Sequence, residues 1–390
     1  MLLLFFIYIA FIGLGLPDSL FGTAWPAIYM DMRLPFSYGS FVTSLVYLGT
    51  MISAMTSAKL INRLGTGKVT AISTLLTTVA MLGYSNSHSF GFILLCALPL
   101  GLGAGAIDTA LNNYVAIHYS AIHMNFLHCF YGIGITISPF ILAKTMAAEN
   151  GWSKGYFIAF IVQLSITVLL FIALPLWNKQ GRGMTEADEQ VEVLSLKEII
   201  HTKGVRTMWS LFFFSCAIEC TCGSWGSTYL VEKNGLLPES AATKMIFYFI
   251  GVAVGRFLSG VISKYLNIYK IISISMCLII CGIVTLFMPT AGWLLVVGLL
   301  LIGIGNGPLF PNFNYIAPIL FGESKAPAII GSQMTVASLS FMIVPIVFGQ
   351  IAQFIGMWIF PIVLGVFGCI LIATYLSMHQ WLLKKDKKYY

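Results

Sequence analysis

Three acidic residues lie within long apolar segments of this sequence, at Asp18, Asp108 and Glu219. A charged side chain at the centre of a bilayer costs about 2.5 to 3.5 kcal/mol on insertion scales. Acids in such segments therefore tend to face an internal cavity, where they can carry a proton or bind a solute. We expect these three carboxylates to line one polar cavity.

Asp18 ends the segment Gly13-Leu14-Gly15-Leu16-Pro17-Asp18. Proline frees a backbone carbonyl and glycine lets a helix bend, a pattern typical of broken helices that line cavities. We expect the first helix to bend here and Asp18 to serve coupling or substrate binding, in preference to capping a broken helix. The alternative is a helix N-cap.

Two further polar groups follow helical spacing. Asp108 and Asn112 are one turn apart on one face, so a carboxylate and an amide could together hold a hydroxylated solute or a cation. Asn125, His128 and Tyr131 recur at i, i+3 and i+6, and all three side chains can hydrogen-bond a polar ligand. The alternative for His128 is a structural histidine.

Two tryptophans follow two of the acids at a similar separation, Trp25 after Asp18 and Trp225 after Glu219. Indole rings stack on cations and sugar rings, so we expect each half of the chain to bring one acid and one aromatic ring to the cavity. The alternative is a membrane-interface position.

Arg256 lies toward the cytoplasmic end of a span, where we expect it to pair with a loop acid or with carbonyls.

The apolar composition of the sequence predicts that membrane-spanning helices position these residues. The 390 residues are 58% hydrophobic and 9% charged, whereas soluble domains are about 25% charged. A span needs roughly 20 apolar residues, and the sequence offers about twelve such runs, so we predict an all-α integral membrane protein. The runs lie near residues 3 to 29, 38 to 61, 68 to 86, 90 to 117, 122 to 147, 155 to 177, 207 to 231, 241 to 264, 268 to 288, 291 to 318, 326 to 354 and 357 to 382. The first has no basic region before it, so we interpret it as a retained helix and not a signal peptide.

Basic residues predict the orientation of these spans, because loops rich in Lys and Arg stay cytoplasmic. One set of loops holds Arg33, Lys144, Lys154, Lys233 and Lys244, and Arg256 lies within a span. The other fifteen of the 21 basic residues fall in the opposite loops and the C-terminal tail. Both termini are therefore predicted to be cytoplasmic, and the net charge of +7 reflects topology, not nucleic-acid binding.

An internal repeat divides the chain in two. When the sequence is shifted by 202 positions, three glycines of the fourth span align with three of the tenth: Gly101 with Gly303, Gly103 with Gly305 and Gly105 with Gly307. The same shift aligns Asn112 with Asn314 and places Asp18 one position from Glu219. This predicts parallel six-helix halves, residues 1–177 and 207–390, joined by a cytoplasmic linker at 178–206. In such proteins the substrate site lies between the halves.

Motifs for other chemistry are missing from the sequence. The Gly101 to Gly105 pattern follows no strand, so close packing of helices explains it better than nucleotide binding. The sequence has no phosphate-binding lysine motif, zinc-protease motif or nucleophile elbow. We therefore expect no enzyme activity, no cofactor and no metal site.

Over its whole length the sequence resembles the major facilitator superfamily, in its spans, its two halves and a basic loop after the second span. That loop, Ala58-Lys59-Leu60-Ile61-Asn62-Arg63-Leu64-Gly65-Thr66-Gly67-Lys68, is similar to the superfamily signature. It departs from the signature at Ala58, usually glycine, and at Asn62, usually aspartate. The resemblance implies the major facilitator fold.

A narrower resemblance is carried by Asp108-Thr109-Ala110-Leu111-Asn112, which is similar to the acid-Thr-Ala-x-Asn pattern of the fucose and proton symporter family. The family also has an aspartate in its first helix, so the resemblance implies proton-coupling and sugar-binding roles for Asp18 and Asp108. The family's fifth helix reads Asn-x-x-Gln-x-Phe-Asn. Here His128 and Tyr131 replace two of its amides, so fucose itself is not implied.

Our leading hypothesis from the sequence is proton-coupled uptake of a sugar or polyol by alternating access, in a multi-pass protein of the plasma membrane or bacterial inner membrane. Sodium is the alternative coupling ion. Efflux of amphipathic drugs or metabolites is the alternative function, and a receptor or membrane enzyme is a third possibility. The expected partners are one small solute, the coupling ion and the lipid bilayer. We expect a monomer, because each chain supplies both halves.

Overall fold

The computed structural model describes residues 2–119, 121–148, 151–180, 196–288, 292–322 and 325–385. Within these ranges the regular elements are α-helices and two short 3₁₀ helices, η1 and η2, without strands. The first group comprises α1 (Leu2–Asp31), η1 (Phe36–Tyr38), α2 (Gly39–Leu64), α3 (Thr66–Ser85), α4 (Phe90–His118), α5 (Ala121–Thr145), α6 (Gly151–Ile172) and α7 (Leu174–Gln180). The second comprises α8 (Leu196–His201), α9 (Val205–Glu232), α10 (Pro238–Ile262), α11 (Ile268–Phe287), α12 (Gly292–Asn306), α13 (Leu309–Phe321), α14 (Ala326–Ile355), η2 (Met357–Ile359) and α15 (Phe360–Lys385).

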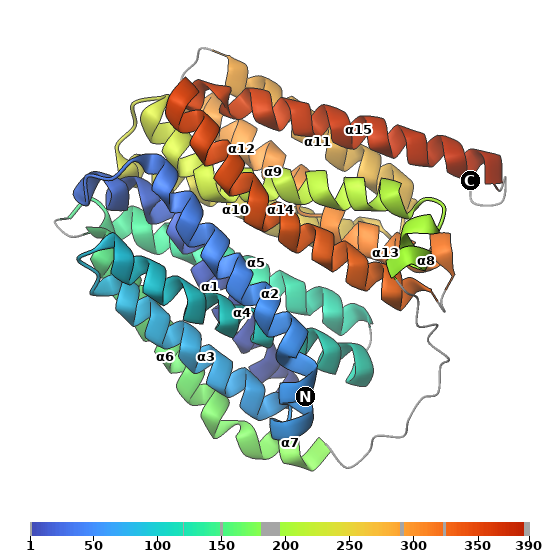
Figure 1. Ribbon diagram of the computed structural model, residues 1–390, viewed down its shortest axis with the longest axis horizontal. Helices are drawn as coiled ribbons and strands as arrows, with labels where there is room; N and C mark the ends of the chain where they lie inside the picture. Colours follow the sequence, from blue (N-terminus) through green and yellow to red (C-terminus); the bar gives the residue numbers. More distant parts are fainter. Residues whose placement is uncertain are drawn as a thin grey trace.

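The helices form two bundles that lie side by side (Figure 1). Helices α1 to α6 make up the N-terminal bundle and α9 to α15 the C-terminal bundle. The start of α1, the end of α15, α7 and α8 all lie toward the same end of the two bundles, with α8 and the end of α15 at the right of Figure 1 and the start of α1 and α7 at the bottom. Most of the predicted linker, residues 181–195, lies outside the described residues.

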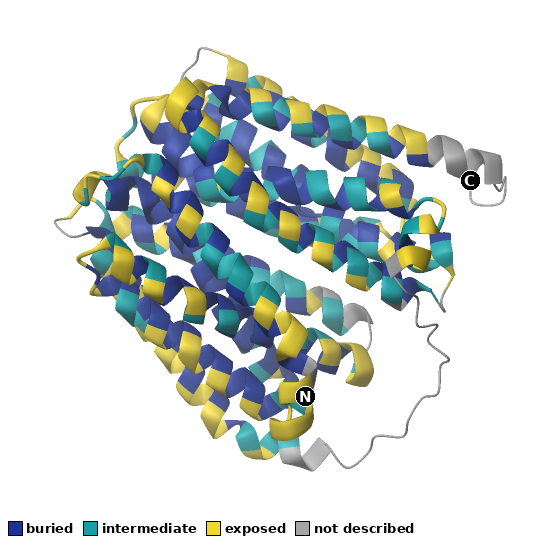
Figure 2. Cartoon of the chain, in the orientation of Figure 1, coloured by how far each residue is buried: buried dark blue, intermediate teal, exposed yellow. Residues whose placement is uncertain are grey.

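Ten helical segments among the described residues are long and apolar enough to cross a membrane. They are Leu2–Asp31, Phe36–Ser57, Phe90–His118, Phe126–Thr145, Gly151–Ile172, Pro238–Ile262, Ile268–Phe287, Gly292–Phe321, Ala328–Ile355 and Met357–Met378. Many large apolar residues are exposed, and exposed positions recur along the outer helices of both bundles in Figure 2. Leu95, Ile172 and Phe354 are examples, and an apolar exterior of this extent matches a lipid environment.

Helix α3 has the length of a span, although its composition is more polar. Its buried hydroxyls donate within the helix, from Thr70 to Thr66 O at 2.9 Å and from Thr74 to Thr70 O at 2.8 Å. Gln163 Nε2 of α6 donates to Thr77 Oγ1 at 2.8 Å. Hydrogen bonding inside the bundle thus removes the cost of burying these polar groups.

The glycine repeat is also a repeat of packing contacts. A Cβ added at Gly101, Gly105 or Gly103 would collide with the backbone carbonyls of Val46, Thr50 and Ser73, respectively. The corresponding glycines meet carbonyls 202 positions further on: Gly303 meets Tyr248, Gly307 meets Val252, and Gly305 meets Ser275. In the N-terminal half, α4 packs on α2 and α3 through these glycines. In the C-terminal half, α12 and Gly307, the residue that follows it, pack on α10 and α11 in the same way. This confirms the prediction that these glycines serve close helix packing.

The alternative that Asp18 caps a broken first helix is wrong, because α1 continues through Pro17 and Pro26. Gly15 instead allows α1 to approach α5, since an added Cβ would lie 3.0 Å from Ile135 N and 3.2 Å from Gly134 Cα. The Ser138 hydroxyl of α5 donates to the Leu16 carbonyl. Neighbouring helices can hold a proline-containing membrane helix together in this way.

Two predicted spans are interrupted in the structure. The tenth was predicted as one helix, but α12 ends at Asn306 and α13 begins at Leu309. Pro308 lacks an N–H and its ring clashes with the preceding turn. The sixth was predicted to reach residue 177, but α6 ends at Ile172, and α7 starts just before Pro175, a position at which proline is tolerated.

Candidate functional site

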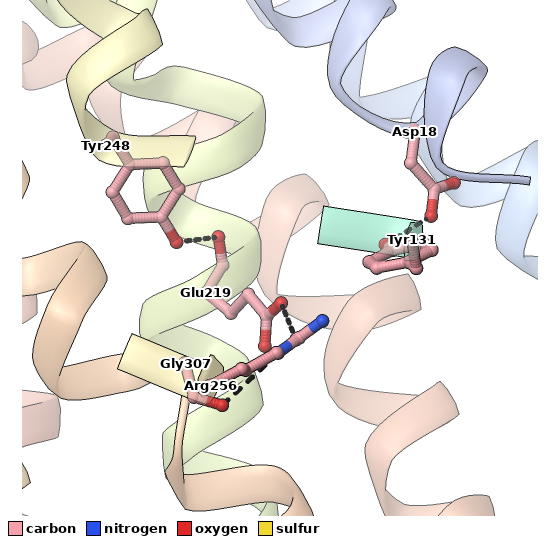
Figure 3. Close-up of polar contacts among 6 residues, drawn as sticks. All are labelled: Asp18, Tyr131, Glu219, Tyr248, Arg256 and Gly307. Carbon is pink, nitrogen blue, oxygen red and sulfur yellow. Dashed lines mark hydrogen bonds and ion pairs between the residues drawn. The ribbon is translucent and has the colours of Figure 1, made fainter. Parts of the chain in front are cut away.

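Four side chains form a continuous polar network between the two bundles (Figure 3). In the N-terminal bundle, Tyr131 Oη of α5 donates to Asp18 Oδ2 of α1 at 2.6 Å. The guanidinium carbon of Arg256 in α10 lies 5.4 Å from the centre of the Tyr131 ring. Arg256 Nη2 then donates to Glu219 Oε1 of α9 at 3.2 Å. The network thus joins acids from equivalent regions of the two halves.

The helix break after α12 holds the cationic end of this network. Arg256 Nε donates to the carbonyl oxygen of Gly307 at 3.2 Å. Pro311, four residues later, has no N–H with which to bond that carbonyl. Tyr248 Oη of α10 also donates to the backbone oxygen of Glu219 at 3.4 Å. Backbone atoms therefore fix the Arg256–Glu219 pair within the C-terminal bundle.

The Arg256–Glu219 pair is well shielded, with 11% of the Arg256 side chain and 20% of the Glu219 side chain exposed. This corrects the expectation for Arg256. It does contact a carbonyl, but its acidic partner is Glu219 of a neighbouring membrane helix and not a loop acid. A signal for this pairing was present in the sequence, because an acid and a base inside apolar segments neutralise each other at lowest cost.

Asp18 and Asp108 are exposed, although Pro17, Ser19 and Ile107 beside them are buried. Asn112 Nδ2 donates to Asp108 Oδ1 at 2.8 Å and to Asp108 O at 3.0 Å, so the predicted carboxylate–amide pair is present. Asp18 is within electrostatic range of Asp108, Glu219 and Arg256. The three predicted acids therefore lie in one region, and two of them are open to solvent.

Of the three polar residues predicted on one face of the fifth helix, Asn125, His128 and Tyr131, only Tyr131 is shown to join the network. Tyr131 belongs to the network, whereas His128 is partly buried and meets the Phe11 ring edge to face at 5.9 Å. That contact fits the structural alternative for this histidine. Asn125 is in α5, but its side chain lies outside the described residues.

The two tryptophans lie away from the four-residue network. Trp225 is 1% exposed and packs against Phe36 and Phe348, with ring centres 6.2 and 5.9 Å away. Six residues separate it from Glu219, which is about 9 Å along a helix. Trp25 is equally buried and donates from Nε1 to Phe36 O at 2.6 Å. Trp225 therefore packs across the boundary between the bundles, whereas the ring contacts of Trp25, with Phe21, Tyr29 and Phe90, lie within the N-terminal half.

Contacts between the bundles close one end of the molecule, where α1 and α9 finish. Tyr29 of α1 donates to the Glu232 carboxylate of α9. Nearby, Ser227 Oγ donates to Thr23 O at 3.2 Å, Ser44 Oγ to Met342 O at 2.8 Å, and Ser37 N to Gln353 Oε1 at 3.1 Å. The bundles diverge toward the opposite end in Figure 1. That end carries α7 and α8.

Among the residues that the structure describes, no group of three or more His, Cys, Asp or Glu side chains could hold a metal ion. The side chains of the network offer hydrogen-bond donors and acceptors, one guanidinium charge and carboxylates that can bind protons. These are the interactions with which a protein can bind a polar solute and respond to protons.

Comparison with known proteins agrees with this architecture. "Bypass of stop codon protein 6" of Saccharomyces cerevisiae is 22% identical over 390 residues, which cover 91% of this chain and 78% of that protein. The glucose/mannose transporter GlcP of Bacillus subtilis is 22% identical over 240 residues, covering 59% of this chain and 58% of GlcP. The crystal structure of a mutant of the nucleoside transporter NupG superposes with a TM-score of 0.72 at 11% identity, covering 96% of this chain and 98% of that one.

The family model of the Major Facilitator Superfamily matches residues 7–345, most of the described fold. The matched residues include all four residues of the polar network. The chain is therefore a transporter of the Major Facilitator Superfamily.

Proposed function

We propose that this protein couples the movement of protons to the transport of a small polar solute, a sugar or a related polyol. The observation that carries the proposal is the network from Asp18 through Tyr131 and Arg256 to Glu219, which links a solvent-accessible acid of one bundle to an ion pair of the other. A change in the charge of Asp18 is thereby felt at the contact between the halves. The glucose/mannose transporter among its relatives and the similarity to fucose and proton symporters support a sugar.

The proposal includes twelve spans with both termini in the cytoplasm. Helices α3 and α9 complete the count, since they have 20 and 28 residues and pack within the bundles. The start of α1 and the end of α15 lie at one end (Figure 1), which is the end of the basic loops. The open end is then cytoplasmic, and the end closed by Tyr29 and Glu232 faces outward. We accordingly propose that this is the inward-open state, and that the protein acts as a monomer in the plasma membrane or bacterial inner membrane.

In the proposed mechanism Asp18 and Asp108 exchange protons and meet the solute. Asp108 and Asn112 offer a carboxylate and an amide to solute hydroxyls, while Tyr131 and Glu219 border the same space. Protonation removes the charge of a carboxylate, which lowers the cost of enclosing it when the bundles close at the cytoplasmic end. Asn125, His128 and Trp225 complete the proposed set, with Trp225 reaching the cavity when the outer end opens.

The proposal is tested with purified protein in sealed, energised vesicles, by recording proton movement after solute addition. The solutes are D-glucose, D-mannose, L-fucose, glucuronic acid and a cationic drug such as ethidium. Proton movement with a sugar that Asp18→Asn abolishes supports coupled transport. Asp31→Asn is the matched control, because Asp31 is an acid at the outer end that accepts a hydrogen bond from Trp152 Nε1 at 3.0 Å.

Efflux of amphipathic cations remains the second candidate, because three carboxylates against one guanidinium make the central region acidic. The same vesicles separate the two candidates. Proton movement with the cationic drug alone supports antiport. Sugar movement without protons, in the intact protein, contradicts proton coupling.

A further inference from the structure

We infer that the central site binds two protons in each transport cycle, one on Asp18 and one on Asp108, while Glu219 stays ionised throughout. This inference rests on the proposed proton coupling and extends it to the number of protons and the residues that hold them. It starts from the different surroundings of the three membrane carboxylates.

Glu219 carries its counter-ion with it. Arg256 Nη2 lies 3.2 Å from Glu219 Oε1, and both residues belong to the C-terminal bundle. Arg256 is also anchored to Gly307 O, and the Glu219 backbone to Tyr248, all in the same bundle. When the bundles rock against each other as rigid bodies, this pair moves as one unit and keeps its net charge of zero.

The two aspartates have only neutral hydrogen-bond donors on their own bundle among the described residues. Asp18 accepts from the Tyr131 hydroxyl at 2.6 Å, and Asp108 accepts from the Asn112 amide at 2.8 Å. Neither contact supplies a positive charge. Both carboxylates therefore remain as net negative charges wherever the N-terminal bundle moves.

The other charged and titratable groups around Asp18 do not neutralise the two negative charges of Asp18 and Asp108. Asp108 of α4, Glu219 of α9 and Arg256 of α10 lie within electrostatic range of Asp18. Tyr47 approaches from α2 and Tyr131 from α5. His128 lies near Arg256, which already pairs with Glu219. Three carboxylates and one guanidinium leave two negative charges in the central region.

Alternating access requires an occluded state in which water is excluded from this region. Enclosing an unpaired carboxylate is strongly unfavourable, whereas a protonated carboxyl group is only a polar group that needs hydrogen bonds. Two charges without counter-ions therefore require two protons when the solute is neutral. Tyr131 and Asn112 can remain hydrogen-bonded to the protonated acids, because a carboxyl group still accepts through its second oxygen.

The test is an infrared pH titration of the full-length protein in lipid, following the carbonyl bands of protonated carboxyl groups without any solute. We expect Asp18→Asn to remove one titrating band and Asp108→Asn to remove another. Glu219→Gln is expected to remove none. Because Glu219→Gln leaves Arg256 unpaired, the double variant Glu219→Gln/Arg256→Gln provides the same reading if the single variant fails to fold. Asp31→Asn controls for acids outside the central region.

A band that disappears with Glu219→Gln or with the double variant would overturn the inference, since Arg256 would then exchange partners and leave Glu219 to carry a proton. Loss of a band in only one aspartate variant would also overturn it. No solute takes part in the titration, so failure of every sugar in the vesicle assay contradicts the proposed function while leaving this result intact. With any neutral solute that moves protons, two protons per solute are expected, and one would contradict the inference.

Discussion

The guanidinium group of Arg256 stacks over the ring of Tyr131, 5.4 Å from its centre, across the boundary between the two bundles. The same tyrosine holds Asp18 through its hydroxyl, and the same arginine holds Glu219. One aromatic ring therefore separates the acid that is open to solvent from the acid that is neutralised. Changes to either side of that ring should have different consequences.

Removing the hydroxyl of Tyr131 should weaken coupling while preserving the contact between the bundles. Tyr131→Phe keeps the ring under Arg256 and loses the hydrogen bond to Asp18, so we expect about 1 kcal/mol lower stability and reduced proton-driven accumulation. Tyr131→Ala also loses the cation–π contact, worth about a further 1 kcal/mol, as well as ring packing. Thermal denaturation in detergent and vesicle uptake measure these effects. Equal losses for Phe and Ala would exclude a separate role for the ring.

Removing Arg256 alone should be much worse than removing the whole ion pair. Arg256→Met leaves Glu219 as a shielded charge without a partner, which costs about 3 to 5 kcal/mol. The double variant Arg256→Met/Glu219→Gln should recover most of that loss, because the remaining groups are neutral. A double-mutant cycle on thermal stability measures the coupling. Additive effects of the two changes would contradict the pairing that the structure shows.

Breaking the outer contact should favour the outward-open state. Tyr29→Phe removes the hydrogen bond to Glu232, which at an exposed carboxylate is worth about 1 kcal/mol and changes the ratio of states about fivefold. Spin labels at the exposed positions Arg33 and Leu237, in a cysteine-free background, report the opening as a longer distance.

Tyr38→Phe is the matched control for this experiment, because Tyr38 lies at the same end and has a hydroxyl in no hydrogen bond that the structure shows. It should leave the distance distribution unchanged. An unchanged distribution in Tyr29→Phe as well would mean that other contacts close the outer end.

Adding a methyl group at a glycine of the repeat should destabilise the helix packing. A Cβ at Gly103 would lie 2.5 Å from Ser73 O and 2.7 Å from Thr77 Cγ2, so Gly103→Ala should cost about 1 to 3 kcal/mol. At Gly91, by contrast, nothing lies within 4 Å of an added Cβ. Gly91→Ala should therefore be neutral or slightly stabilising, since alanine favours helix. Thermal melting of both variants decides whether contact or helix propensity controls the result.

The sequence alone determined the class of this protein and the position of its repeat. Hydropathy identified apolar runs near the observed helices, because each span must bury its own backbone hydrogen bonds and be apolar along its length. The 202-residue offset was visible because the same close contacts recur in both halves, as with Gly105 and Gly307. Asp18, Asp108 and Glu219 stood out because charge is costly in an apolar segment.

Only the tertiary structure decided which of these residues meet. Arg256 lies 37 positions after Glu219, and Tyr131 lies 113 positions after Asp18, so helix spacing could not pair them. Trp25 and Trp225, 200 positions apart, likewise meet the same residue, Phe36. A proline breaks a helix or is absorbed by it according to its neighbours, as Pro308 and Pro17 show. Local sequence specifies which groups are costly to bury, but the packing of helices from both halves decides which partner offsets that cost.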